Sequence, residues 1–143
     1  LCEGAFGLLG QRDDPMGQPL SIVRNVSRSL KPQAKAVFTV LNAVAMLRRH
    51  TNADVAEGRF DPLTMVESSV CPPREGQPGV AVRERGFVPT ELTLFFRLAG
   101  MSVLNIWGGT AGNWGRRALD LDETEIMIVA RKTGAPPPAG EAP

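Results

Sequence analysis

Residues 87–103 have the sequence FVPTELTLFFRLAGMSV, which predicts a helix that leads directly into a buried strand. Pro89 suits the first turn of a helix, and Gly100 suits its C-terminal cap. One face of the helix is apolar, and it carries Leu92, Phe95, Phe96 and Ala99. We therefore expect a helix over residues 87–100 and a strand over residues 103–107.

The same alternation of helix and strand extends to both sides of this stretch. Residues 36–41 (AVFTVL) form a continuous apolar run typical of a strand covered on both faces, so we expect a central, parallel strand. Residues 20–30 show a helical period that ends at Pro32, and residues 126–130 (IMIVA) predict another buried strand. Helices that alternate with buried strands predict an α/β fold with a doubly wound sheet.

The remaining segments are less apolar. We expect a helix over residues 42–50 and a polar loop over residues 51–61. Residues 63–69 and 80–85 favour strands and predict an antiparallel pair, as a small β insertion or an edge. Residues 108–125 predict a long, glycine-rich loop, and loops of that length are usually functional or disordered.

Composition restricts the class of protein. The 143 residues include 43% hydrophobic and 22% charged residues with a net charge of +1, which is typical of one globular core. Because the charges are scattered, they indicate neither a nucleic-acid nor a membrane partner. Cys2 and Cys71 are far apart and lack metal-ligand spacing, so we expect no disulfide between them, no metal site and a cytoplasmic location. Residues 133–143 predict a disordered tail.

Five stretches in this order resemble the class I S-adenosylmethionine (SAM)-dependent methyltransferases. They are residues 1–9, the turn Leu30-Lys31-Pro32, residues 37–42, residues 87–103 and residues 126–132. Gln33-Ala34 departs from the two glycines that follow the proline in the family. The resemblance covers residues 1–132 and implies the C-terminal portion only of a Rossmann-like methyltransferase sheet, with an antiparallel last strand. The family's glycine-rich cofactor loop has no counterpart in the sequence.

The resemblance also implies where SAM binds. Glu3, Gly4, Ala5 and Phe6 match the loop after the family's fourth strand, which lines the cofactor pocket. The alternative is a simple strand-to-helix turn with one core aromatic residue. Asn42 follows a predicted strand, at the edge where open α/β sheets bind ligands, and is a candidate for binding substrate.

Four further residues are candidates for contact with the methyl acceptor or for catalysis. Asn113 and Trp114 lie in the glycine-rich loop and could form a lid over a small organic molecule, whereas Trp107 is expected to be structural. Arg85 could bind an acidic acceptor, although an exposed edge strand is the simpler explanation for its charge. His50 could act as a general base, but a solvated helix end is favoured.

The resemblance predicts methyl transfer from SAM to a small-molecule acceptor in the intact protein. No catalytic residue is assigned, and we expect the chain alone to be inactive because it lacks the glycine-rich loop. Two alternatives stay open: a noncatalytic Rossmann-like binding or interaction module, and an unrelated Rossmann-like oxidoreductase. The sequence preceding Leu1 would decide among them. Self-association through the exposed edge of the first strand is also expected.

Overall fold

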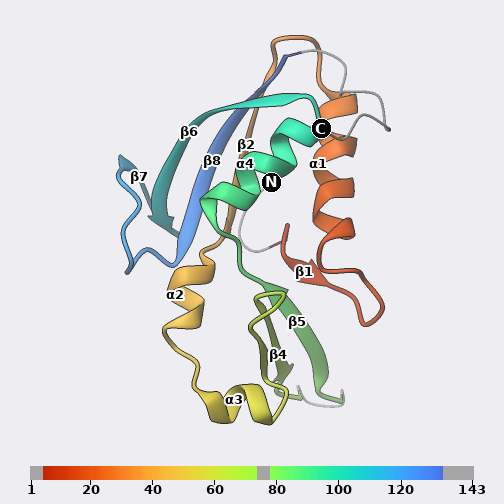
Figure 1. Ribbon diagram of the computed structural model, residues 1–143, viewed down its shortest axis with the longest axis vertical. Helices are drawn as coiled ribbons and strands as arrows, with labels where there is room; N and C mark the ends of the chain where they lie inside the picture. The colour runs from red at the N-terminus through yellow and green to blue at the C-terminus, as the bar shows by residue number, and fades with distance from the viewer. Residues whose placement is uncertain (1–4, 74–77, 134–143) are drawn as a thin grey trace.

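The computed structural model describes residues 5–73 and 78–133, which form two four-stranded antiparallel sheets and four helices (Figure 1). The first predicted strand, with Cys2, Glu3 and Gly4, lies outside the described residues. So does almost all of the predicted tail, and the predicted self-association edge belongs to that first strand. These expectations remain predictions.

The larger sheet has the order β2-β8-β6-β7, and each neighbouring pair is antiparallel. Its strands are β2 (Lys35–Leu41), β8 (Glu125–Lys132), β6 (Met101–Thr110) and β7 (Asn113–Arg117). The last strand is therefore antiparallel, as expected. The expectation that β2 is central and parallel is wrong for the described sheet, because β8 inserts between β2 and β6 and separates the two strands that run in the same direction.

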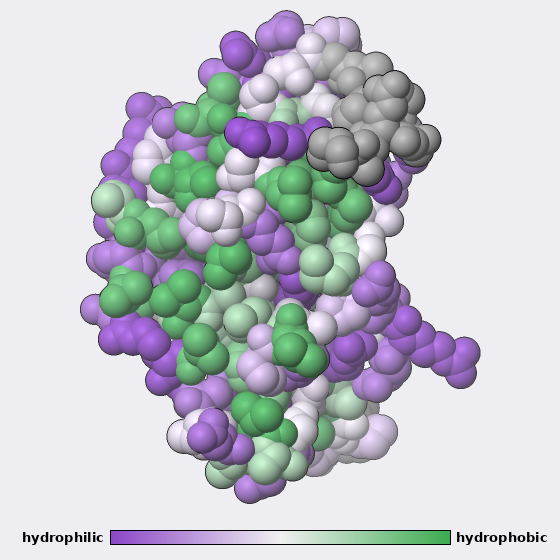
Figure 2. All heavy atoms as spheres, viewed as in Figure 1, coloured by the Kyte–Doolittle hydropathy of each residue, from purple (hydrophilic) through white to green (hydrophobic). Residues whose placement is uncertain are grey.

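Two helices, α1 (Gly17–Ser29) and α4 (Pro89–Leu98), cover one face of the larger sheet (Figure 1). No described helix covers its opposite face, so the expected doubly wound arrangement is not completed within the described residues. Apolar and hydrophilic residues are interspersed over the side on which these helices lie (Figure 2). In this view the visible described residues therefore form no broad, continuous apolar surface.

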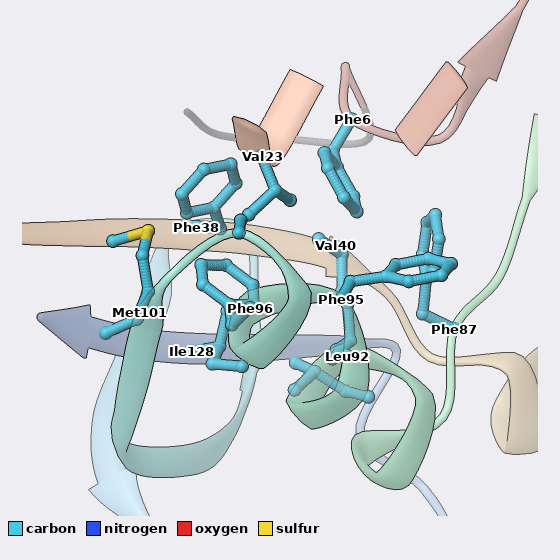
Figure 3. Close-up of a cluster of buried hydrophobic side chains, with 13 residues drawn as sticks. Phe6, Val23, Phe38, Val40, Phe87, Leu92, Phe95, Phe96, Met101 and Ile128 are labelled. Atoms are coloured by element: carbon cyan, nitrogen blue, oxygen red, sulfur yellow. The ribbon is translucent and has the colours of Figure 1, made fainter. Parts of the chain in front are cut away.

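The hydrophobic core fills the space between these helices and the sheet (Figure 3). Phe38 on β2 is at its centre: its ring centroid lies 5.0 Å from that of Phe96 on α4 and 5.5 Å from that of Phe6, both edge to face. Alternate residues of β8 point into this core because side chains alternate across a strand. They are the fully buried Ile126, Ile128 and Ala130.

The smaller sheet has the order β1-β5-β4-β3. Its strands are β1 (Leu8–Leu9), β5 (Val80–Arg85), β4 (Val66–Cys71) and β3 (Phe60–Asp61). The predicted antiparallel pair is confirmed as β4 and β5, paired from Val66 with Arg85 to Cys71 with Val80. Cys71 is exposed and free, and the absence of a bond to Cys2 stays a prediction.

The segment expected to be a polar loop, residues 51–61, holds a helix and a strand instead. Helix α2 (Ala43–Leu47) is shorter than predicted, and α3 (Asn52–Ala56) follows it. A capping box begins α3: the Asp54 carboxylate accepts hydrogen bonds from the backbone nitrogen and the hydroxyl of Thr51, both at 2.7 Å. A five-residue helix is too short to show an apolar period, which is why the sequence pattern did not reveal it.

The predicted long loop over residues 108–125 is also wrong in part. Strand β6 continues to Thr110 and turns tightly into β7, with a register shift between Gly108 and Gly109. Only the residues between β7 and β8 form an irregular connection. Because glycine and charged residues are common in loops, the composition of this hairpin concealed its strands.

Candidate functional site at the carboxyl end of strand β2

Asn42 directly follows β2 and is almost completely buried, at 1% exposure. Its side-chain oxygen accepts from the backbone nitrogen of Val44 at 3.1 Å, which caps α2. Its side-chain nitrogen donates to the carbonyl oxygen of Glu123 at 2.8 Å. Asn42 therefore lies at the edge expected from the sequence, but both ends of its amide are engaged within the protein.

The loop before β1 meets the same end of β2. The Phe6 side chain is fully buried, with its ring centroid 4.8 Å from that of Phe87. The backbone nitrogen of Arg85 donates to the Gly7 carbonyl at 2.9 Å. A Cβ atom at Gly7 would overlap the carbonyl oxygen of Arg85, so the close approach requires glycine here. The Phe6 ring is thus part of the core, whereas Ala5 is exposed.

The segment between β5 and α4 connects Asn42 to the loop before β1. The Phe87 nitrogen donates to the Leu41 carbonyl at 2.9 Å, and the Ala43 nitrogen donates to the Phe87 carbonyl at 3.0 Å. Because Phe87 also contacts Phe6, the structure brings Ala5, Phe6 and Asn42 to one edge of the sheet. Glu3 and Gly4 of the same predicted set lie outside the described residues.

Arg85 is buried, at 3% exposure, and the idea that it lies on a solvated face is wrong. Its guanidinium group forms an ion pair with Glu91 in the first turn of α4 and donates from Nε to the Thr64 carbonyl at 2.9 Å. It also lies over the ring of Phe87, 4.7 Å from the centroid. Arg85 therefore links the smaller sheet to α4. The alternating charges of residues 83–85 in the sequence did not reveal this structural role.

Asn113 and Trp114 do not join this edge. They begin β7, where Asn113 is exposed and Trp114 is half-buried. The Trp114 ring packs against the backbone of Gly109 on β6 and lies in a groove with Trp107. None of the residues that line that groove belongs to the set around Asn42.

The sequence did not indicate the role of Glu123. Its carboxylate is almost buried and pairs with Arg117 on β7, with Nη2 and Oε2 separated by 2.9 Å. The Glu123 carboxylate raises the pKa of Arg117 above its ordinary value. Since the Glu123 carbonyl also accepts from Asn42, this residue fastens the irregular connection to the end of β2.

His50 is also placed differently from the expectation of a solvated helix end. Its side chain is only 11% exposed and stacks on Phe60, with centroids 4.4 Å apart. Nε2 lies 3.4 Å from a Glu67 carboxylate oxygen, and Nδ1 lies 4.0 Å from Asp54. The imidazole packs between α3 and β4, so its position indicates a structural contact within the smaller sheet.

The described residues lack two further features. They contain no group of histidine, cysteine, aspartate and glutamate residues suited to a metal ion. Within the same part of the chain, no helix has the length and apolar character needed to cross a membrane.

No family model matches the sequence, and no curated protein matches it. Solved structures do resemble it. The CcbJ methyltransferase of Streptomyces caelestis superimposes with a TM-score of 0.66 at 19% identity, covering 92% of this chain and 58% of that one. A S-adenosylmethionine-dependent methyltransferase of Clostridium acetobutylicum gives a TM-score of 0.59 at 10% identity, covering 93% and 56%.

The chain thus spans less than two thirds of the length of each of these two enzymes. At these identities the likeness concerns the fold and not the reaction. We conclude that the chain has a mixed α/β fold shared with structurally known methyltransferases.

Proposed function

We propose that the protein transfers a methyl group from SAM to a small-molecule acceptor, and that this chain supplies the later strands of the catalytic domain. The observation that carries the proposal is the superposition of 92% of the chain on a methyltransferase. The described loop and Asn42 also meet at the carboxyl end of β2, where open α/β sheets bind ligands.

In this proposal the described residues contact SAM on one side only. SAM supplies an activated methyl group when bound. Ala5 is the exposed member of the predicted cofactor loop, and Phe6 would contribute its backbone because its ring is in the core. We propose that residues 3–6 form one wall of the pocket, and that residues upstream of Leu1 provide the groups that hold the ribose and the amino-acid end.

Asn42 and Arg85 are proposed to act as positioning residues. Asn42 fixes the start of α2 and the connection at Glu123, and Arg85 fixes the smaller sheet against α4. These contacts hold rigid the elements that surround the carboxyl end of β2. Orientation of two reactants by a rigid site is a large part of what accelerates a bimolecular transfer.

The test uses the protein expressed with its native upstream sequence. Ala5→Trp should block the proposed pocket, because a bulky side chain replaces an exposed alanine, and should reduce SAM affinity by about tenfold or more. Ala53→Trp is the matched control, since Ala53 is exposed on α3. Transfer of a labelled methyl group from SAM to a panel of small acceptors is the second measurement.

The expected result is SAM binding and methyl transfer in the unchanged protein and in the control, with loss of both in Ala5→Trp. Absence of SAM binding in the unchanged protein would favour the noncatalytic binding module instead. Equal effects of the two tryptophan variants would show that residues 3–6 do not line the cofactor pocket.

A further inference from the structure

The face of the larger sheet opposite α1 and α4 carries a groove with a cavity volume of about 630 Å³. Strands β2, β6, β7 and β8 all contribute to it. The alternation of side chains along β8 shows on which face the groove lies. Ile126 and Ile128 point into the core, whereas Met127 and Val129 line the groove. Its volume lies within the range of roughly 300–1,000 Å³ that is typical of pockets for small organic ligands.

Two tryptophans from neighbouring strands form an aromatic wall of this groove. Trp107 lies near the end of β6, and Trp114 lies on β7. Gly109 allows this arrangement because any side chain there would overlap the Trp114 ring. Large aromatic rings on a sheet and a tight hairpin are well suited to stack against a planar ligand.

The two charged residues that line the groove are both basic. Lys35 and Arg116 line it, and both are exposed. The Arg116 guanidinium lies 5.8 Å from the ring centroid of Trp107. Among the described residues that line the groove none is acidic, and neither cation forms an ion pair with another described residue.

We propose that this groove is a binding site for a planar aromatic anion, such as an aromatic carboxylate. The ring would lie against Trp107, Trp114 and Met127, and the anionic group would face Lys35 and Arg116. The groove includes neither Phe6 nor Asn42, so this site is separate from the carboxyl end of β2. The inference therefore does not depend on the proposed methyl transfer, but it requires that any residues upstream of Leu1 leave this face of the sheet open.

The chain offers a direct readout, because its only two tryptophans line the groove and it contains no tyrosine. Fluorescence excited at a tryptophan-selective wavelength consequently reports on the groove, once the absorbance and emission of the naphthyl probes themselves are subtracted. The probes are 2-naphthoate, its neutral analogue 2-naphthamide, and the non-aromatic anion cyclohexanecarboxylate. Saturable changes in emission, checked by calorimetry, are expected for 2-naphthoate, with affinity about fivefold or more weaker for each of the other two probes.

Two variants test whether Arg116 and Lys35 bind the anionic group of the probe. Arg116→Gln and Lys35→Gln should each weaken 2-naphthoate by about threefold or more and leave 2-naphthamide unchanged. Arg28→Gln on α1 is the control, since Arg28 is exposed on a helix that covers the opposite face. All three positions are on the surface, so the variants should keep the far-ultraviolet circular dichroism of the unchanged protein.

Three results would overturn the proposal: no saturable response to 2-naphthoate, equal affinity for the acid and the amide, or equal weakening by the control. A tryptophan emission maximum that shifts with protein concentration, with no response to the probes, would also overturn it. That result would show that a second copy of the chain covers the groove.

Discussion

The larger and the smaller sheet are stabilised by different interactions. The larger sheet and its helices enclose Phe38, Phe96 and Ile128, all buried almost completely. In the smaller sheet, by contrast, strands β4 and β5 leave Val70 67% and Val80 61% exposed. Short-range polar contacts contribute to the stability of that region, as in the capping box of α3. Apolar packing therefore stabilises the first region, whereas individual polar pairs stabilise much of the second.

The largest effect on the free energy of unfolding is expected from a substitution in the core beneath the larger sheet. Phe96→Ala removes a fully buried ring that packs edge to face on Phe38, and it should lower the free energy of unfolding by about 3–5 kcal/mol. Leu94→Ala on the same helix is the control, because Leu94 is 54% exposed, and it should change the value by less than about 0.5 kcal/mol. Urea denaturation measures both, and similar losses would contradict the core described above.

A smaller effect is expected where the two regions join. Glu91→Gln leaves the buried Arg85 guanidinium without its counter-charge and should lower the free energy of unfolding by about 2 kcal/mol. The double variant Arg85→Met/Glu91→Leu replaces both charges by apolar groups and should lie within about 1 kcal/mol of the unchanged protein. A double variant that loses more than Glu91→Gln would refute this account of the pair.

The next prediction concerns the smaller sheet alone and depends on pH. Hydrogen bonds from the Thr51 hydroxyl, and then from Arg59, hold the pKa of Asp54 well below its ordinary value of 3.8. The ionised carboxylate therefore stabilises the folded state fully above pH 3.8, and this contribution disappears as the pH falls below that value. Asp54→Asn should weaken hydrogen-exchange protection of the α3 amides at neutral pH.

The difference between Asp54→Asn and the unchanged protein should narrow as the pH falls from 3.8 towards the lowered pKa of native Asp54. In that range the carboxyl of the unfolded chain takes up a proton first, and the native carboxyl becomes neutral only at the lower end. Protection of the amides of α4 serves as the internal control and should hardly respond to the substitution. A difference that persists undiminished in acid would mean that the charge of Asp54 does not hold α3.

The smallest effect is expected at Leu63, which precedes β4 and is 93% exposed. Leu63→Ser should change the free energy of unfolding by less than about 0.5 kcal/mol, since an exposed side chain away from caps and buried pairs contributes little. Urea denaturation checks this. A loss near that of Phe96→Ala would show that Leu63 is covered in solution.

The difference between apolar packing in the larger sheet and polar pairs in the smaller one also explains which parts of the fold could be predicted. The apolar face of α4 and the run IMIVA in β8 follow a clear period, and both elements lie within a few residues of their predicted bounds. Helix α3 is too short for such a period. The parallel setting of β2 was mispredicted because a local apolar run says nothing about which strand will pair with it.

The candidate site was predictable in place but not in detail. Asn42 was expected at the carboxyl edge because it follows an apolar run, and it lies there. Its role as a cap could have been inferred from the helix-forming residues that follow it. The burial of Arg85 depends on Glu91, and that of His50 depends on Phe60 and Glu67. Such pairings between separate elements leave no periodic signal in the sequence.

The most direct test of the proposed function is a calorimetric titration with SAM of two proteins: the chain as printed, and the chain preceded by its native upstream sequence. We expect micromolar binding in the longer protein and little or none in the chain alone, because one wall of the proposed pocket would not offset the entropy of association. Micromolar binding to the chain alone would contradict our placement of the cofactor, and no binding to the longer protein would contradict the proposed methyl transfer.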